Sequence, residues 1–350
     1  MVLSAAMLML TLSACQPASS APVQKPGQLV RLADQRQINL RCAGSGTPTV
    51  ILESGFGADS GAWYKVQPEL ARMTRVCAYD RAGYGFSDPA PLPVDGATIA
   101  RDLDEALRRA DIPGPYVMVG HSAGGLYARL FAGRRLREVK GLVLLDPTVE
   151  GLAGDPSRDG LQGVRQRAQR CLAAAVSQPQ PAPDSSAWEG CRPPKPDPHA
   201  LAVMRRPETW RGQLSELDAI FGRTSESVLR MGDLLQHIPI YVLTASDTAN
   251  AAPKLPYTEE SIWTLQHIRL TARADAGWQR TVLSSHLMMI DRPDAVVSAV
   301  TAMVSAVRAG KAPEPLPPSE GAGDTDPFKI GSPTAEPPTP SGFESPGATK

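Results

Sequence analysis

The chain has 350 residues, of which 42% are hydrophobic, and its 36 basic residues balance 36 acidic ones. That length is enough for one large domain with a sizeable apolar core, or for two small domains. Zero net charge gives no electrostatic reason to expect nucleic acid as a partner. The sequence contains no C-x-x-C motif or Cys/His cluster, so no metal site is expected.

The N-terminal residues are predicted to be a targeting segment. Residues 1–14 are mostly apolar or small, and Leu12-Ser13-Ala14-Cys15 resembles a bacterial lipobox, although no Lys or Arg precedes the apolar run. The run is too short to span a bilayer. The resemblance implies a signal peptide over 1–14, a lipid on Cys15, and a tether over 15–27. We therefore expect a lipid-anchored protein of the bacterial cell envelope, at the outer membrane and facing the periplasm. The alternative is an uncleaved or cytosolic extension.

Four further cysteines support an oxidising compartment. Cys42 ends one predicted strand, Cys77 lies in another, and Cys171 and Cys191 bracket a proline-rich loop. Four cysteines allow three pairings. We favour Cys42–Cys77 with Cys171–Cys191, since both are plausible in a periplasmic chain.

The first part of the chain alternates predicted strands and helices. In chain order these are a hairpin over Gln28–Cys42, a strand over Thr49–Glu53, a helical face at Trp63, Val66 and Leu70, a strand over Arg75–Tyr79, a helix over Ile99–Leu107, a strand over Tyr116–Val119, a helix from Leu126 to Phe131, and a strand over Val139–Leu145. Alternating units of this kind build a parallel sheet with helices on both faces.

The alternation stops between 150 and 234, where helical patches and a proline-rich loop predict an inserted helical cap. It resumes with a strand over Ile238–Ala245, a helix over Glu259–Ala276, a short strand over Thr281–Ser284 and a helix over Ala295–Val307. The expected core is therefore 28–149 together with 235–309. Residues 310–350 hold few large apolar groups, so we expect them to be a disordered Pro-rich tail.

One stretch carries a chemical signature. Gly120-His121-Ser122-Ala123-Gly124 is a G-x-S-x-G pattern between a predicted strand and a predicted helix, the context of a nucleophile elbow. The serine hydroxyl must project from a strained turn, and the two glycines keep Cβ atoms out of the strand–helix crossing. The alternative is an ordinary glycine-rich turn between a strand and a helix.

These residues resemble the α/β-hydrolase superfamily over about 36–308. The matching features are Glu53-Ser54-Gly55-Phe56-Gly57, Tyr79-Asp80-Arg81-Ala82-Gly83-Tyr84-Gly85-Phe86-Ser87, the Ser122 elbow, the cap, and Ser285-His286-Leu287 followed by Asp291-Arg292-Pro293. The resemblance implies an α/β fold with a mostly parallel eight-stranded sheet, and a triad in the order serine, acid, histidine. It also makes the strands of Cys42 and Cys77 neighbours.

A serine nucleophile needs a base within hydrogen-bond reach. His286 follows the last short strand, where the family places its base. His121 lies inside the elbow, and its side chain is expected to point away from the site. His199, His237 and His267 fall in cap or helix contexts, where surface or packing roles are expected.

The acid of the triad has two candidates, Asp146 and Asp247. Asp146 ends the strand after the elbow helix, whereas Asp247 follows a later strand where many relatives carry the acid. The spacing to Asp247 is one residue shorter than usual, so we favour Asp146. For either aspartate the alternative is a carboxylate that caps a turn.

The resemblance implies an oxyanion hole made by the backbone N–H groups of Phe56 and Ala123. Ser54-Gly55 stands where many relatives have His-Gly, which keeps the backbone donor but removes a side chain that often braces the loop. Asp80 and Arg81 are interpreted as a structural turn at the pocket edge.

The expected function is hydrolysis of a small-molecule ester through an acyl-enzyme, carboxylesterase-like, with no cofactor. An aspartate at the elbow would have indicated epoxide or haloalkane chemistry, and a serine argues against both. Peptidase or thioesterase action stays open, because the cap carries no readable motif. The alternative outside enzymes is a non-catalytic envelope protein that uses the same scaffold for binding.

Overall fold

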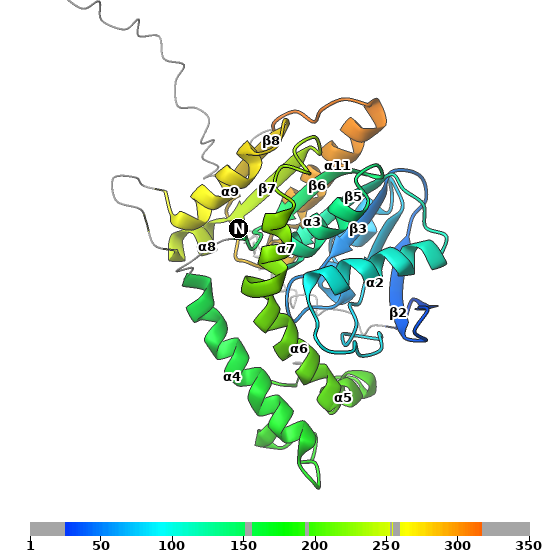
Figure 1. The fold of residues 1–350 in the computed structure, drawn as a ribbon, viewed down its shortest axis with the longest axis vertical. Coiled ribbons are helices and arrows are strands. Elements are labelled where there is room, and N and C mark those ends of the chain that lie inside the picture. The colour runs from blue at the N-terminus through cyan, green and yellow to red at the C-terminus, as the bar shows by residue number, and fades with distance from the viewer. Residues whose placement is uncertain (1–24, 151–155, 193–195, 253, 255–259, 317–350) are drawn as a thin grey trace, which may run out of the picture.

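An eight-stranded sheet runs through the middle of the molecule, with strand order β1-β2-β4-β3-β5-β6-β7-β8 (Figure 1). The computed structural model describes residues 25–150, 156–192, 196–252, 254 and 260–316. The strands are β1 (Gln28–Arg31), β2 (Gln37–Ala43), β3 (Thr49–Glu53), β4 (Val76–Tyr79), β5 (Tyr116–His121), β6 (Val139–Leu145), β7 (Ile240–Ala245) and β8 (Gly277–Val282). β2 is antiparallel to β1 and β4, and every other pairing is parallel.

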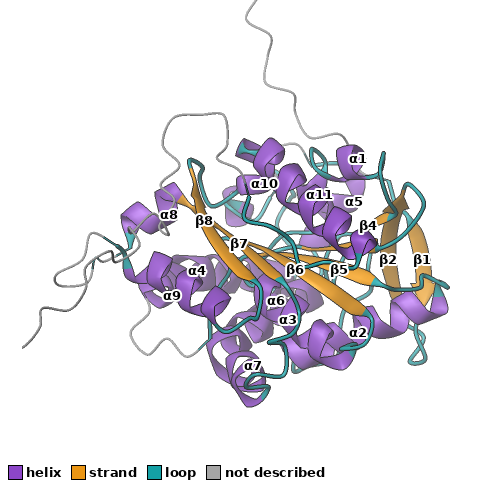
Figure 2. Cartoon of the chain, turned by 90° about the horizontal axis from the view of Figure 1, so that it is seen from above, coloured by secondary structure: helices purple, strands orange, loops and turns teal. Residues whose placement is uncertain are grey.

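Helices cover both faces of this sheet (Figure 2). One face carries α2 (Gly96–Arg109), α3 (Gly124–Arg134), α7 (Ser225–Arg230) and α9 (Ile262–Ala272); the other carries η1 (Ser60–Trp63), α1 (Gln67–Leu70), α10 (Met288–Asp291) and α11 (Pro293–Ala309). The two faces bury separate apolar clusters, and successive strand residues alternate between them: Met118 belongs to the first cluster, whereas Val117 and Val119 belong to the second. The pleat of a strand has this period of two. Both faces of the sheet are therefore buried under helices, as expected for a parallel sheet.

The ends of some elements differ from their predicted bounds. β8 begins at Gly277, four residues before the predicted strand. Its residues do not alternate between buried and exposed: only the third and the sixth, Gln279 and Val282, are buried. Such an edge strand has no continuous apolar run from which to read its start. α9 begins after Ser261, whose side chain accepts a hydrogen bond from the N–H of Thr264.

Between β6 and β7, which are neighbours in the sheet, the chain forms a helical insertion. It contains α4 (Pro156–Val176), η2 (Ser186–Trp188), α5 (Pro198–Met204), α6 (Pro207–Ala219), the π-helical turn η3 (Ile220–Thr224), and α7. In Figure 1, α4, α5 and α6 extend away from the sheet. The buried side chains of Trp188 and Trp210 form a small core there with Cys171 and Cys191.

Both favoured disulfides are confirmed. Cys42 and Cys77 are directly opposite each other on antiparallel β2 and β4 and are bonded, and Cys171 is bonded to Cys191. In both pairs the Cα atoms lie close enough for a bridge, at 4.0 Å and 5.8 Å.

The C-terminal segment departs from the sequence prediction over its first residues. The hydroxyl of Tyr241 donates to the carbonyl of Glu314, and Leu316 packs against the apolar cluster under α11. The segment predicted to be disordered from 310 is therefore packed as far as 316, and the rest of it lies outside the described residues. Among the described helices, none is long and apolar enough to cross a bilayer.

Candidate active site

Ser122 lies at the sharp turn between β5 and α3. Its φ is +52°, in the left-handed region that non-glycine residues rarely adopt. Hydrogen bonds fix this turn: the N–H of Ser122 donates to Leu145 of β6 at 3.0 Å, and its carbonyl accepts from Gly125 and Thr148. A strained backbone held by its neighbours is typical of a functional turn, and the geometry is that of a nucleophile elbow.

The glycines of the elbow are required by close contacts. A Cβ atom on Gly120 would lie 2.7 Å from the carbonyl oxygen of Gly124. A Cβ atom on Gly124 would lie 2.6 Å from the carbonyl oxygen of Glu53, at the end of β3. The helix α3 can therefore leave the sheet at this angle only because both positions have no side chain.

His286 lies on the loop between β8 and α10, with its imidazole hydrogen-bonded to Asp146. The distance from Nδ1 to Oδ2 of Asp146 is 2.7 Å. Since an ionised carboxylate only accepts, Nδ1 carries the proton and donates it, which leaves Nε2 as the basic nitrogen. The His286 side chain is 42% exposed, whereas that of Asp146 is 0% exposed.

The Asp146 carboxylate is held by donors on both oxygens. Oδ1 accepts from the indole N–H of Trp263 at 2.7 Å and from the backbone N–H of Ala245 at 3.1 Å. Burial by itself would raise the pKa of Asp146, but the hydrogen bond from His286 and its other donors outweigh burial, so the pKa lies below the ordinary value. Asp146, at φ +43°, is thus an ionised and rigidly oriented partner of the imidazole.

The rival aspartate lies elsewhere. Asp247 is exposed in the first turn of α8 (Ser246–Ala251), and its backbone N–H donates to Ser284. Its carboxylate accepts a 3.4 Å hydrogen bond from the neighbouring Ser246 hydroxyl. Of the two candidates, Asp146 is the one that contacts His286.

The prediction for His121 was wrong. Its ring lies 4.6 Å from the ring of His286, and its Nε2 lies 2.8 Å from the His286 carbonyl oxygen. Burial, together with the positive charge that His286 can carry, lowers the pKa of His121 to about 3. His121 is therefore a neutral donor that positions the backbone of His286. His121 is the last residue of β5, directly before the elbow turn at Ser122, so the sequence pattern of the strand does not fix the direction of its side chain.

The remaining histidines have the packing and surface roles that the sequence predicted. His267 is buried between Thr244 and the carbonyl of Pro147. His199, on α5, stacks on Phe86 with ring centroids 3.9 Å apart, and His237 forms an exposed pair with Asp275.

The loop after β3 brings Phe56 beside the elbow. A Cβ atom on Gly55 would lie 3.1 Å from Cβ of Ser122, so the two turns are in close contact. Within the described part of the chain, neither the N–H of Phe56 nor that of Ala123 donates a hydrogen bond to another protein group. Two free N–H groups next to a serine can bind a developing oxyanion.

Two features were not found from the sequence. One is Trp263 as a donor to Asp146, and the other is a buried charged cluster of Glu53, Arg81 and Glu216. Glu53, a charged residue directly after the apolar run of β3, is the signal that could have indicated the cluster. Cys15 lies outside the described residues, and among those described no group of His, Cys, Asp and Glu could hold a metal ion.

Comparisons with known proteins agree with this architecture. The family model described as alpha/beta hydrolase fold matches residues 48–180. An uncharacterized protein of Schizosaccharomyces pombe is 36% identical over 150 residues, which are 35% of this chain and 28% of that protein. The chain thus spans under a third of the length of this curated relative.

Solved structures with similar folds cover more of the chain. The epoxide hydrolase CorEH, solved without ligand, is 17% identical with a TM-score of 0.58, covering 80% of this chain and 99% of that one. A protein of Acinetobacter baumannii AYE provisionally assigned as a lipase is 16% identical with a TM-score of 0.58, covering 81% of this chain and 92% of that one. At such identities the likeness concerns the fold.

Proposed function

This chain has the α/β-hydrolase fold, and from that fold and its site we propose that it is a serine hydrolase of the carboxylesterase type. The observation that carries the proposal is the hydrogen bond of 2.7 Å between His286 and the buried Asp146. It gives the imidazole a defined tautomer beside a strained serine elbow, which is the arrangement that activates a serine hydroxyl.

In the proposed reaction, Ser122 Oγ attacks the ester carbonyl and His286 Nε2 takes its proton. The N–H groups of Phe56 and Ala123 bind the tetrahedral oxyanion, and Asp146 stabilises the imidazolium. His286 then protonates the leaving alcohol as the acyl-enzyme forms. Water, deprotonated by the same imidazole, releases the acid and regenerates the serine.

We do not propose epoxide hydrolysis from the similarity of the fold to that of an epoxide hydrolase. An elbow aspartate attacks through a carboxylate that already carries charge, whereas Ser122 requires the base that His286 supplies. The site therefore supports acyl transfer to a hydroxyl better than opening of an epoxide.

The test is hydrolysis of p-nitrophenyl esters with acyl chains of graded length. We expect the parent to hydrolyse at least the short esters, and Ser122→Ala to lose all but the background rate while unfolding at the parent temperature. Parent activity that Ser122→Ala retains would refute the proposal. The preferred chain length would give the substrate class.

A further inference from the structure

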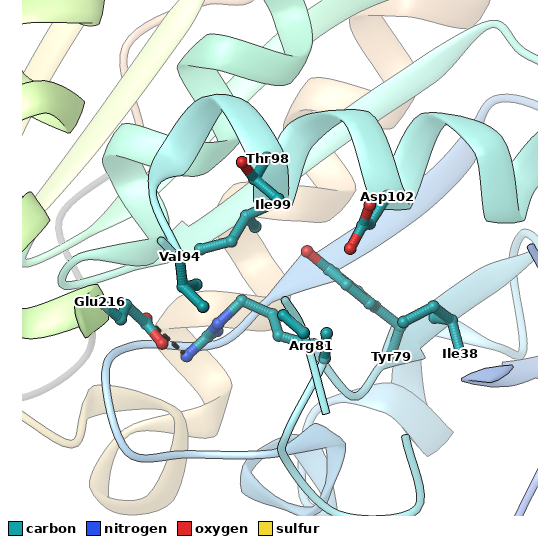
Figure 3. A pocket seen from close by; sticks show the side chains of 10 residues that line it. Ile38, Tyr79, Arg81, Val94, Thr98, Ile99, Asp102 and Glu216 are labelled. Carbon is teal, nitrogen blue, oxygen red and sulfur yellow. Dashed lines mark ion pairs between the residues drawn. The ribbon is translucent and has the colours of Figure 1, made fainter. Parts of the chain in front are cut away.

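Three buried ionisable side chains from different parts of the chain meet beneath the loop that carries Phe56. Glu53 ends β3, Arg81 follows β4, and Glu216 belongs to α6 of the helical insertion. Arg81 pairs with Glu53 at 3.0 Å and with Glu216 at 3.2 Å, and all three side chains are at most 2% exposed. Figure 3 shows Arg81 and Glu216 pointing toward each other. Buried charges are tolerated only when paired and hydrogen-bonded in this way.

Arg81 also holds the backbone of the Phe56 loop. Its guanidinium donates to the carbonyl of Ser54 at 2.6 Å and to the carbonyl of Gly55 at 2.9 Å. The Gly55 carbonyl and the Phe56 N–H belong to one planar peptide unit and point in opposite directions. Fixing the oxygen therefore fixes the direction of the N–H, and a charged donor on the oxygen polarises that N–H.

A tyrosine holds the other side of the same loop. The N–H of Gly57 donates to the hydroxyl of Tyr84 at 3.4 Å, and that hydroxyl donates to Glu216 at 2.8 Å. Tyr127 on α3 donates to the other oxygen of Glu216 at 2.9 Å. Arg81 lies over the rings of both tyrosines, 4.7 Å and 5.3 Å from their centroids. One carboxylate of the insertion thus contacts both Arg81 and Tyr84, two side chains that form hydrogen bonds with the backbone of the loop.

The cavity next to Arg81 does not offer a substrate site. It is lined by residues such as Tyr79, Val94 and Asp102 (Figure 3), and its volume is about 10 Å³. That is about the space of one water molecule. Arg81 therefore acts on its protein neighbours.

We propose that Arg81 and Glu216 are positioning residues for the reaction at Ser122, through which the helical insertion sets the direction of the Phe56 N–H. This inference rests on the proposed serine-hydrolase function. Arg81 is suited to the role because its planar fork serves two carbonyls and two carboxylates at once, which a lysine could not do.

The first test replaces Glu216 by glutamine, with Glu150→Gln as the matched control. Glu150 also forms a buried pair, with Arg129, but it does not contact the Phe56 loop. With p-nitrophenyl acetate we expect Glu216→Gln to lower kcat by about 10- to 100-fold with KM nearly unchanged. Glu150→Gln removes a buried charge pair of the same kind, so it can lower the unfolding temperature equally. It should nevertheless keep kcat within about twofold, because Glu150 does not contact the Phe56 loop. Equal losses of kcat in both variants would overturn the proposal.

A second pair separates positioning from general stabilisation. Tyr84→Phe and Tyr127→Phe each remove one hydrogen bond to Glu216, but only Tyr84 also contacts the loop. We expect Tyr84→Phe to lower kcat by up to about tenfold, the equivalent of one hydrogen bond, and Tyr127→Phe to lower it less. Equal effects would indicate a structural role alone.

A third measurement does not depend on activity. In Glu216→Gln, hydrogen exchange of the peptide spanning 53–60 should become faster than in the parent, while Glu150→Gln leaves it unchanged. Unchanged exchange in Glu216→Gln refutes the positioning role even if the enzyme is active. Absence of any Ser122-dependent activity in the parent refutes the proposed function and with it the role in catalysis, while the exchange result still decides whether the insertion holds the loop.

Discussion

At the scale of single residues, the site depends on contacts between parts of the chain that are far apart. Asp146 and His286 are 140 positions apart and meet because β6 and the loop after β8 end at the same edge of the sheet. The sequence alone left Asp146 and Asp247 as close rivals, since both follow strands that end at this edge. The structure separates them, because the Asp146 carboxylate is buried against His286 whereas Asp247 is exposed.

The first prediction compares Asp146→Asn with Asp247→Asn. An amide at 146 presents no charge to the imidazolium and favours the wrong tautomer of His286, so kcat should fall by about 10⁴-fold. The exposed Asp247 should be replaceable with kcat within about twofold of the parent. Steady-state kinetics with one short ester decides the matter, and a large loss in Asp247→Asn alone would contradict our assignment.

The second prediction concerns the pH dependence of stability at Glu53. Burial raises the pKa of Glu53 to about 7 from its ordinary value of 4.5, although Arg81 opposes the shift. The folded protein therefore binds this proton more tightly than the unfolded chain, so its contribution to stability is full below pH 4.5 and is lost as the pH rises through about 7.

The variant Glu53→Gln has no carboxyl group that could bind this proton. The free energy of unfolding of the variant relative to the parent should therefore rise between about pH 4.5 and 7, by up to about 3 kcal/mol. Urea unfolding at a series of pH values measures the difference. A difference that stays constant over that range would show that Glu53 does not titrate there.

At the scale of elements, the elbow depends on the absence of side chains where α3 crosses β3 and β5. The third prediction compares two Gly→Ala changes on helices. In Gly124→Ala the new Cβ would lie 2.6 Å from a backbone oxygen, so we expect a loss of about 1–3 kcal/mol in unfolding free energy and reduced activity. Gly163, on α4, has nothing within 4 Å of such a Cβ, so Gly163→Ala should stabilise by about 0.5–1 kcal/mol.

Chemical denaturation of both variants tests this pair. If Gly124→Ala unfolds like the parent, the crossing has more room than the structure indicates. If both variants gain stability, helix propensity alone would account for the result.

The strands and helices were predicted where a regular apolar pattern exists. β3, β5 and β6 each contain three or four consecutive apolar residues, and α2 has a clear amphipathic pattern, so their places were evident from the sequence. β8 was misplaced because four of its six residues are only partly buried and its apolar and polar residues are mixed. The helices of the insertion have mixed faces because several of their polar groups, such as Glu216, are buried by pairing. Sequence periodicity cannot register a charge that a distant partner neutralises.

At the scale of the whole molecule, the two disulfides fit an oxidising compartment. Cys42–Cys77 ties β2 to β4, and Cys171–Cys191 ties α4 to the loop at η2. The proposed location at the cell envelope depends in addition on Cys15, which lies outside the described residues.

The fourth prediction therefore concerns that cysteine. Expressed as the full chain in a bacterium and labelled with radioactive palmitate, the parent should incorporate label and partition into the detergent phase of Triton X-114. Cys15→Ala should do neither, because in the proposed anchor the Cys15 thiol is the lipid acceptor. Incorporation of label by Cys15→Ala, or no incorporation by the parent, would contradict the lipid anchor.

The proposed function requires Ser122 to be an activated nucleophile, and a fluorophosphonate probe tests this directly. The probe reacts with a serine hydroxyl only where a neighbouring base removes its proton. After labelling of the intact protein and digestion, mass spectrometry should find a single adduct on the peptide that contains Ser122, and Ser122→Ala should carry none. Labelling that is absent from the parent, or that persists in Ser122→Ala, would contradict the role of Ser122 as the nucleophile.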